Sequence, residues 1–482
     1  MDRRNFLRIT SFLGASALLP ALPSKLAAML MPDPGFTKAA FGADFKWGVA
    51  AAAYQIEGAW NADGKSPSVW DHFTQHKKHK IKTKENGNIA CDFYNRYEGD
   101  IALVKEMNFN VFRFSTAWSR ILPDGTGKVN QKGLDFYHRV IDSCLKTGVE
   151  PWITLYHWDI PQILQKKGGW ANREVINWFS EYADLVTRTY GDKVKNWMVL
   201  NEPMAYTALG YLIGMHAPGK IAPNQFLKAA HHTTIVQAEG GRIIRKNVPG
   251  ANIGTTFSCS QVSPTSEKEG SKKAAHRMNS FLNRLYIEPL LGMGYPTDDF
   301  PFLKKIERHI HPNDMDKVSF DFDFIGLQNY TQVVTKKAAL IPFLGANQVK
   351  PQKRGVQPEN ITDMGWEVYP EGIYNIIKQF AAYKNIPPII ITENGAAFPD
   401  SVTAEGKIHD SKRIEFFKKY LENVLKAKKE GVDIRGYFVW TLMDNFEWAE
   451  GYKPRFGLVH VDFETQQRRI KDSGLWFKEF LK

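Results

Sequence analysis

Cysteine is scarce in this chain, and its scarcity excludes several kinds of protein. Only Cys91, Cys144 and Cys259 occur among 482 residues. An odd number of cysteines at wide spacing makes neither a disulfide framework nor a cysteine-based metal site. We therefore expect all three to be packing residues rather than nucleophiles.

The chain also lacks a hydrophobic run long enough for a membrane span. Its most apolar N-terminal stretch, "ITSFLGASALLPAL" (residues 9–22), is shorter than the roughly 20 residues that a spanning helix needs. Arg3 and Arg4 precede it, followed by Phe6 and Leu7. A basic start, a short apolar region and small residues afterwards are typical of an export signal. The arginine pair followed by Phe-Leu resembles a twin-arginine signal. An ordinary amphipathic helix is the alternative.

This N-terminal pattern sets the predicted domain boundaries. Residues 1–35 are expected to be an export signal with a short spacer, and residues 36–482 a single catalytic domain. No clean A-x-A cleavage site is present, and no cysteine follows the apolar stretch, which argues against a lipoprotein anchor. We expect a periplasmic or secreted protein, exported by the twin-arginine machinery without a stable membrane anchor. A passenger that folds before export agrees with a fold that needs no disulfides.

Acidic residues are outnumbered by basic ones, which gives a net charge of 63 − 51 = +12. A basic surface can meet nucleic acid or an anionic membrane. However, the densest basic run, "HKKHKIKTK" (76–84), lies in a predicted loop without interleaved aromatic residues or a nucleic-acid module. We interpret it as a solvated surface and expect no nucleic-acid partner.

Eight strand-like segments alternate with amphipathic helical patterns such as 95–108 and 137–148. No linker, low-complexity tract or internal repeat divides them. Eight strands with helical crossovers predict an α/β fold, a single (β/α)8 TIM barrel, with long connections after strands one, five and six over one mouth. The predicted strands are 45–53, 111–118, 150–157, 196–203, 252–259, 322–331, 388–395 and 434–444.

Two glutamates stand at the C-terminal ends of predicted strands. Glu202 ends strand four in "VLNEPM", and Glu393 ends strand seven in "ITENGAAF". Taken singly, Glu202 could belong to a surface turn before proline and Glu393 to a strand-end salt bridge. In a barrel, both carboxylates face the mouth where catalysis takes place. Two carboxylates in one cleft are what glycosidic cleavage needs, one protonated and one ionised.

Longer motifs resemble those of a known family. "TLYHWDIPQ", "NEP", "TENG" and "WTLMDNFEWAEGYKPRFGLVHVDF" look like the signatures of glycoside hydrolase family 1, the β-glucosidase family. The resemblance runs from "FKWGVAAAAYQIEGAW" to "DSGLWFKEF", in the family's order. It implies a (β/α)8 barrel and a retaining, double-displacement mechanism without metal or cofactor.

The resemblance also implies catalytic roles. Glu202 would be the general acid/base and Glu393 the nucleophile, with carboxyl carbons roughly 5 to 5.5 Å apart. Asn201 would hydrogen-bond the sugar 2-OH, while Arg113 and Tyr330 would contact Glu393. The charge of Arg113 would keep Glu393 ionised, and the charge of Glu393 would raise the pKa of Glu202.

Five further residues match positions that bind the sugar in the family. They are Gln55, His157, Trp440, Glu447 and Trp448, with Trp440 as the stacking floor under the pyranose ring. His157 taken alone would be interpreted as a core histidine. One departure is Gln328, where the family commonly has Asn; this puts the fine sugar preference in doubt, not the reaction.

These observations predict a retaining exo-β-glycosidase, a β-glucosidase acting on a small β-glucoside or oligosaccharide. A β-galactosidase or β-fucosidase of the same family remains an alternative. A 6-phospho-β-glucosidase fits less well, because such relatives generally have Ser where this chain has Glu447, although Lys453 matches their lysine. Both carboxylates are present, which argues against a binding-only relative.

Overall fold

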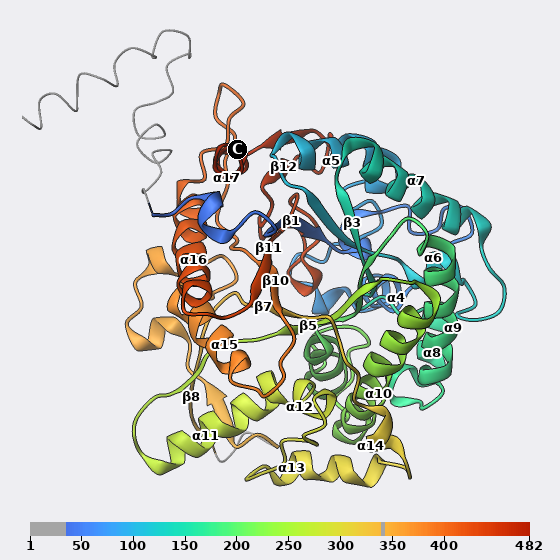
Figure 1. The fold of residues 1–482 in the computed structure, drawn as a ribbon, viewed down its shortest axis with the longest axis vertical. Coiled ribbons are helices and arrows are strands. Elements are labelled where there is room, and N and C mark those ends of the chain that lie inside the picture. The colour runs from blue at the N-terminus through green and yellow to red at the C-terminus, as the bar shows by residue number, and fades with distance from the viewer. Residues whose placement is uncertain (1–34, 339–342) are drawn as a thin grey trace, which may run out of the picture.

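Eight parallel strands close into a barrel in the computed structural model, which describes residues 35–338 and 343–482 (Figure 1). The strand order around the barrel is β1-β11-β10-β7-β5-β4-β3-β2. All eight predicted strands and the (β/α)8 fold are confirmed, with shorter ends than predicted. The predicted export signal lies outside the described residues. The strands are β1 Lys46–Ala51, β2 Val111–Ser115, β3 Glu150–Tyr156, β4 Asn196–Asn201, β5 Asn252–Ser258, β7 Phe324–Gln328, β10 Ile389–Asn394 and β11 Ile434–Trp440.

The barrel interior changes from apolar to polar toward the C-terminal ends of its strands. Val111, Trp152, Met198, Phe324, Ile390 and Phe438 form one buried cluster inside the barrel. Because alternate residues of a strand share a face, the next inward position lies two residues on. That position is Arg113 after Val111, and Thr154 after Trp152. The sequence thus places apolar side chains deep in the barrel and hydrogen-bonding groups nearer the C-terminal ends of the strands.

Helices cover the outside of the barrel because each has one apolar face. In α7, Leu134, Val140, Ile141 and Cys144 are buried at helical spacing, and Gly148 ends the helix with a left-handed backbone (φ 71°). The helical patterns predicted at 95–108 and 137–148 correspond to α5 and α7. The helices around the barrel include α5 Phe93–Glu106, α7 Gln131–Thr147, α9 Val175–Tyr190, α10 Pro223–Asn247, α15 Glu371–Ala381, α16 Ser411–Lys429 and α17 Asp472–Phe480.

The connections after β1, β5 and β7, predicted to be long, carry additional elements. One is a three-stranded sheet of β6 (Val262–Pro264), β8 (Val333–Lys337) and β9 (Ala346–Gln348). After β4 the chain forms a π-helix, η4, at Ala205–Ile213, and after β11 it forms β12 (Val459–Val461) and β13 (Arg468–Ile470). Further helices are α3 Ala53–Ile56, α4 Val69–His76, α6 Trp118–Ile121, α8 Gln162–Lys166, α11 Glu269–Asn279, α12 Ile287–Leu290, α13 Pro301–Lys304 and α14 Asp314–Lys317.

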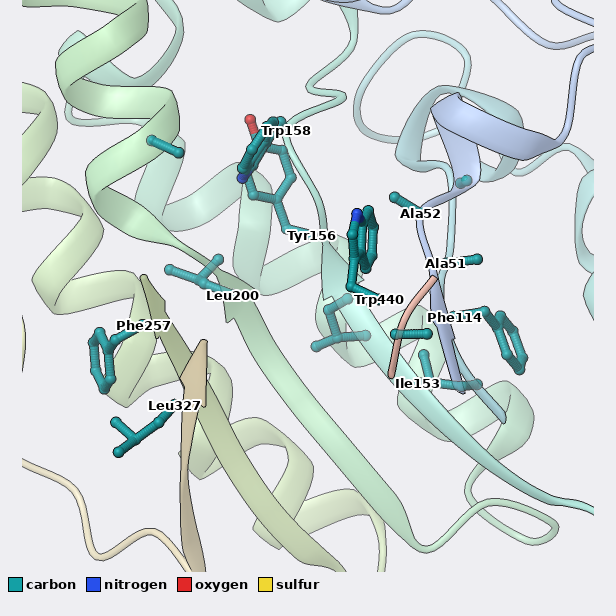
Figure 2. Close-up of a cluster of buried hydrophobic side chains, with 14 of the residues drawn as sticks. Ala51, Ala52, Phe114, Ile153, Tyr156, Trp158, Leu200, Phe257, Leu327 and Trp440 are labelled. Carbon is teal, nitrogen blue, oxygen red and sulfur yellow. The ribbon is translucent and has the colours of Figure 1, made fainter. Parts of the chain in front are cut away.

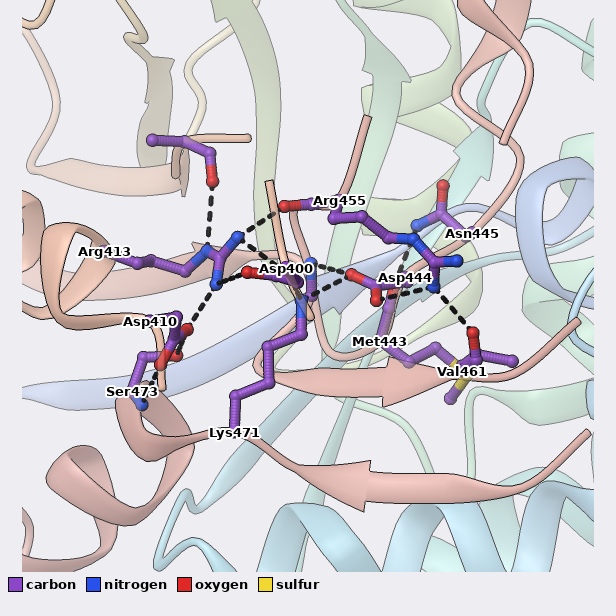
Figure 3. A network of polar contacts seen from close by, with 12 residues as sticks. Asp400, Asp410, Arg413, Met443, Asp444, Asn445, Arg455, Val461, Lys471 and Ser473 are labelled. Carbon is purple, nitrogen blue, oxygen red and sulfur yellow. Dashed lines mark hydrogen bonds and ion pairs between the residues drawn. The ribbon is translucent and has the colours of Figure 1, made fainter. Parts of the chain in front are cut away.

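A buried ionic network holds the loop that follows β11 (Figure 3). Asp444, in this loop, accepts hydrogen bonds from Lys471 Nζ (2.7 Å), Arg455 Nη1 (3.1 Å) and the Gly457 N–H (2.9 Å). Lys471 also pairs with Asp400, which in turn pairs with Arg413 of α16. Buried charges are tolerated only when they are paired and hydrogen-bonded. The loop is therefore held in place by the segment that leads into α17.

The three cysteines are buried and most lysines of the basic run are exposed, as the sequence predicts. Cys91, Cys144 and Cys259 are buried and free, and Cys91 Sγ donates to the Asp444 carbonyl (3.1 Å). In the basic run 76–84 most lysines are exposed. Between residues 35 and 338 and between 343 and 482, no helix is long and apolar enough to cross a bilayer. The same residues contain no cluster of three or more His, Cys, Asp or Glu suited to a metal ion.

Candidate active site

The two predicted carboxylates lie at the C-terminal mouth of the barrel. Glu393 belongs to β10 and is 3% exposed, while Glu202 directly follows β4 and is 7% exposed. Glu202 has a left-handed backbone (φ 45°), and its N–H donates to the Thr256 carbonyl at 3.0 Å. Such backbone strain in a non-glycine residue is typical of functional sites. The structure thus brings both carboxylates to the same mouth.

Arg113 from β2 connects the two sides of this mouth. Its Nη1 donates to Glu393 Oε1 at 2.6 Å, and its Nη2 donates to Asn201 Oδ1. Its Nε donates to Thr154 Oγ1 at 3.1 Å. The second oxygen of Glu393, Oε2, accepts from the Tyr330 hydroxyl at 2.6 Å. Both oxygens of Glu393 are therefore held by donors, as predicted for Arg113 and Tyr330.

Asn201 is the second hydrogen-bonding centre. Its Oδ1 accepts from Arg113, from Thr256 Oγ1 (2.9 Å) and from Gln328 Nε2 (2.7 Å). Its Nδ2 donates to His157 Nε2 at 2.9 Å. Gln328 thus uses its amide N–H to orient Asn201, and its own Oε1 is buried without a partner among the described residues.

The hydrogen bond from Asn201 fixes the tautomer of His157. Because Nε2 accepts, the proton lies on Nδ1, which is buried and has no partner within the described chain. Burial, and secondarily the charge of Arg113, holds the pKa of His157 well below its usual value. His157 is therefore a neutral ring with one N–H free to donate to a ligand.

Gln55, in the short helix α3 that follows β1, meets the loop after β11. Its Nε2 donates to Asn445 Oδ1 (3.0 Å), the Phe446 carbonyl (3.1 Å) and Glu447 Oε2 (3.2 Å). Its Oε1 is buried and unpartnered among the described residues. Burial, followed by the charge of Glu393, raises the pKa of Glu447 to about 8, and the Trp440 side chain donates a hydrogen bond to it. These groups form a set of acceptors and donors suited to hydroxyl groups.

Aromatic rings line the same site. The His157 ring is stacked near Trp440 (centroids 5.8 Å, 29°) and near Trp448 (5.7 Å, 25°), and Trp158 lies 4.4 Å from Trp448. Figure 2 shows Trp440 beside the end of β1, where Ala51 and Ala52 leave room for its ring. Flat apolar faces next to hydroxyl-binding groups are suited to a sugar ring.

The two catalytic candidates differ in pKa for identifiable reasons. Burial raises the pKa of Glu202 well above its usual value, and the charge of Glu393 raises it further. Burial also raises the pKa of Glu393, but the charge of Arg113 and the hydrogen bond from Tyr330 oppose this shift. Glu202 therefore keeps its proton to higher pH. The sequence-based prediction named only the Glu393 charge as the cause, whereas burial is the larger one.

All ten predicted site residues lie around this mouth, but several contributors were not predicted. Thr154 accepts a hydrogen bond from Arg113, and Thr256 donates one to Asn201. The Ser258 side chain forms a hydrogen bond with Glu202. Asn445 binds Gln55. Thr256 and Ser258 stand two residues apart at the C-terminal end of β5, and this polar pair on one face of a buried strand was a usable signal. Lys453, which matches the lysine of the 6-phospho-β-glucosidases, is exposed, unlike the buried carboxylates of the site.

Comparisons with known proteins agree with this geometry. Residues 37–482 match the profile of Glycosyl hydrolase family 1. Beta-glucosidase A of Thermotoga maritima is 42% identical over 447 residues, covering 92% of this chain and 98% of the relative. Beta-glucosidase A of Acetivibrio thermocellus is 42% identical over 450 residues, covering 92% and 99%. A solved structure of the family 1 β-glucosidase from T. maritima matches this chain with a TM-score of 0.87 at 42% identity. The match covers 91% of this chain and 97% of the solved chain. The T. maritima enzyme has also been solved in complex with deoxynojirimycin.

The raised pKa of Glu447 predicts a pH-dependent stability. Its folded pKa of about 8 lies above the ordinary 4.5, so the folded protein holds a proton that the unfolded chain releases. This stabilisation is complete below the unfolded pKa and is lost as the pH rises through the folded pKa. We expect the free energy of unfolding of the wild type to fall, relative to Glu447→Gln, by about 1.4 kcal/mol per pH unit between about pH 5 and pH 8.

Urea unfolding at a series of pH values measures this difference. Glu98→Gln, at an exposed position on α5, controls for the change in net charge. A difference between wild type and Glu447→Gln that is constant over the whole range would contradict the prediction.

Proposed function

Because the chain belongs to glycosyl hydrolase family 1, we propose specific roles for the residues of its active site. The protein is a β-glucosidase, a retaining glycosidase with a (β/α)8 barrel. The observation that carries the assignment of roles is the contrast between Glu393, whose two oxygens accept from Arg113 and Tyr330, and Glu202, whose pKa is raised further. The relative from T. maritima binds glucoimidazole and deoxynojirimycin, which supports a small-molecule substrate here.

In the first step, Glu393 is the nucleophile. A carboxylate oxygen attacks the anomeric carbon, while the bond to the leaving oxygen breaks and that oxygen takes the proton of Glu202. Arg113 and Tyr330 orient Glu393 for this attack. The product is a covalent glycosyl-enzyme and a free alcohol.

In the second step, Glu202 is the base. Esterification removes the charge of Glu393, one of the two main causes of the raised pKa of Glu202, so the Glu202 pKa falls. Glu202 then accepts a proton from water as the water oxygen attacks the anomeric carbon. Glu393 leaves as a carboxylate, and the sugar keeps its original configuration.

The remaining groups hold the glucosyl unit. Gln55 Oε1 would accept from one hydroxyl and His157 Nδ1–H would donate to another. Glu447 would accept hydroxyl hydrogen bonds and the Trp440 ring would lie against the pyranose face. Asn201 Nδ2 has a second N–H besides the one used on His157, which would reach the 2-OH. Trp448 completes the apolar wall.

Two single substitutions distinguish the catalytic roles of Glu393 and Glu202. Glu393→Ala should abolish turnover, and added azide or formate should restore part of it by replacing the nucleophile. Glu202→Ala should lower kcat/KM by about 10²- to 10⁴-fold for poor leaving groups but spare the first step for very good ones, because these leave without a proton. Hydrolysis of aryl β-glucosides with different leaving groups measures both effects.

The product configuration provides the control. With azide, Glu393→Ala should form the α-glucosyl azide by a single displacement, and Glu202→Ala should form the β-glucosyl azide through the covalent intermediate. Glu98→Ala, far from the mouth, should keep wild-type activity. Initial formation of inverted sugar by the wild type, followed by NMR, would refute the assignment.

An unphosphorylated 6-position is a further expectation, and it rests on Glu447. A 6-phosphate would approach this carboxyl, and like charges about 4 Å apart repel by roughly 4 kcal/mol at an effective dielectric near 20. Above about pH 8, where Glu447 is ionised, we expect kcat/KM for 4-nitrophenyl β-glucoside to exceed that for its 6-phosphate by roughly several hundredfold, and by less at lower pH. The ratio should grow as the pH passes about 8, where Glu447 loses its proton, and should shrink in Glu447→Ser. A preference for the phosphate would overturn this role of Glu447.

We also propose that residues 1–35 direct export by the twin-arginine route to the periplasm or beyond. Support comes from the sequence alone, in Arg3 and Arg4 followed by Phe6 and Leu7. A buried core in which all three cysteines are free is compatible with folding before export.

Conservative substitution of the arginine pair tests the export route. Arg3→Lys with Arg4→Lys keeps the charge but should leave the protein in the cytoplasm, because the twin-arginine receptor reads more than charge. Arg8→Lys, outside the pair, is the matched control. Cell fractionation followed by a β-glucosidase assay measures the outcome, and normal export of the double variant would indicate another kind of signal.

A further inference from the structure

A basic cavity of about 560 Å³ lies away from the catalytic carboxylates. It forms where α8 and the turn η3 (Gly169–Ala171) meet the start of α10 and the turn η6 (Lys305–His309). Figure 1 shows α8, α10 and α14 along the same side of the barrel. The lining residues are Lys167, Gly168, Ala171, Asn172, Arg173, Lys220, Gln225, Lys228, His232, Arg308, His309 and His311.

The lining contains five lysines or arginines and three histidines but no acidic residue. Arg173 is engaged by Asp314, with Nη1 2.9 Å from Oδ2. The other four cations, Lys167, Lys220, Lys228 and Arg308, have no ion pair within the described residues, although Lys220 donates to Gln225 Oε1 at 3.0 Å. Four cations without an ion pair around one cavity raise its positive potential and favour an anion.

The start of α10 adds partial positive charge to the same cavity. This helix is 25 residues long, begins with Pro223, and its N-cap residue Ala222 provides no side-chain cap. Pro223 has no N–H, so the first N–H groups of the helix are those of Asn224 and Gln225, and helix N-termini with free N–H groups attract anions. Gln225, in the first turn, lines the cavity.

A buried histidine gives an independent sign of a ligand. His232 is 5% exposed and lines the cavity. Its Nδ1 donates to the Trp170 carbonyl at 2.9 Å, which leaves Nε2 without a hydrogen bond in the described structure. Burial lowers the pKa of His232 to about 4, so Nε2 is a neutral acceptor near pH 7. Such an acceptor, at the wall of the cavity, can take a hydrogen bond from the hydroxyl of a ligand that also carries negative charge.

We propose that this cavity binds a small polyanion that carries at least two phosphate or sulfate groups and a free hydroxyl, such as a phosphorylated or sulfated saccharide. Its volume lies within the range of small-molecule sites and exceeds what one inorganic anion fills. Lys228 of α10 and Arg308 of η6 bind the anionic groups, and His232 Nε2 accepts from the hydroxyl. The site is independent of glucoside hydrolysis at the barrel mouth.

Calorimetric titration at constant ionic strength tests the proposal. The probes are fructose 1,6-bisphosphate, a disulfated disaccharide and inorganic phosphate, each added to the full-length enzyme. We expect saturable binding of one molecule of a polyanionic probe, with inorganic phosphate weaker. Tighter binding of either the phosphorylated or the sulfated probe supports the site and identifies its anionic group.

The double variant Lys228→Gln/Arg308→Gln should weaken that binding by roughly tenfold or more, because two charge-assisted contacts are lost. Lys105→Gln/Lys146→Gln removes the same charge from exposed positions near α5 and α7 and should leave the affinity unchanged. Hydrolysis of 4-nitrophenyl β-glucoside should be normal in both, which shows that they fold. The proposal is overturned if no polyanionic probe binds saturably, or if both double variants bind equally.

Discussion

Arg113 carries its positive charge into the barrel, where the side chain is 1% exposed and water cannot solvate it. Such burial is costly unless every donor is used. Thr154, Asn201 and Glu393 accept from its three nitrogens, so the guanidinium holds groups from β3, β4 and β10 at fixed positions. The same contacts stabilise the charged form of Glu393. The orientation of Glu393 and the control of its ionisation therefore have one physical origin.

The part of the site around Gln55 and His157 follows a different principle, because some of its buried polar atoms have no hydrogen-bond partner among the described residues. Gln55 Oε1 and His157 Nδ1 lack partners among the described residues, while their other atoms are held by Asn445, Glu447 and Asn201. A buried polar atom without a partner raises the free energy of the protein, and a correctly placed hydroxyl removes that penalty. The proposed recognition of the sugar thus uses atoms that the fold has oriented but not paired.

Much of the fold and of the active site was predictable, because strand periodicity and the position of motifs along the sequence determine them. All eight strands and the mouth positions of Glu202 and Glu393 follow from local pattern. Other features depend on contacts between distant segments. A register shift between Met198 and Asn201 alters how β4 pairs with β5, and no local pattern encodes it. Lys167 and Arg308 reach one cavity from segments far apart in the sequence. The dominance of burial in the Glu202 pKa also required the packed structure.

The ionic network below the loop after β11 bears on the order in which the molecule can be assembled. Asp444 is fixed by Lys471, and the loop that starts there supplies Glu447 and Trp448. During synthesis the barrel strands leave the ribosome before Lys471 does. A nascent chain that has already closed its barrel would still hold Asp444 without its main cationic partner. The loop that carries Glu447 and Trp448 can therefore reach its final form only after the segment from Lys471 has left the ribosome and packed beneath it.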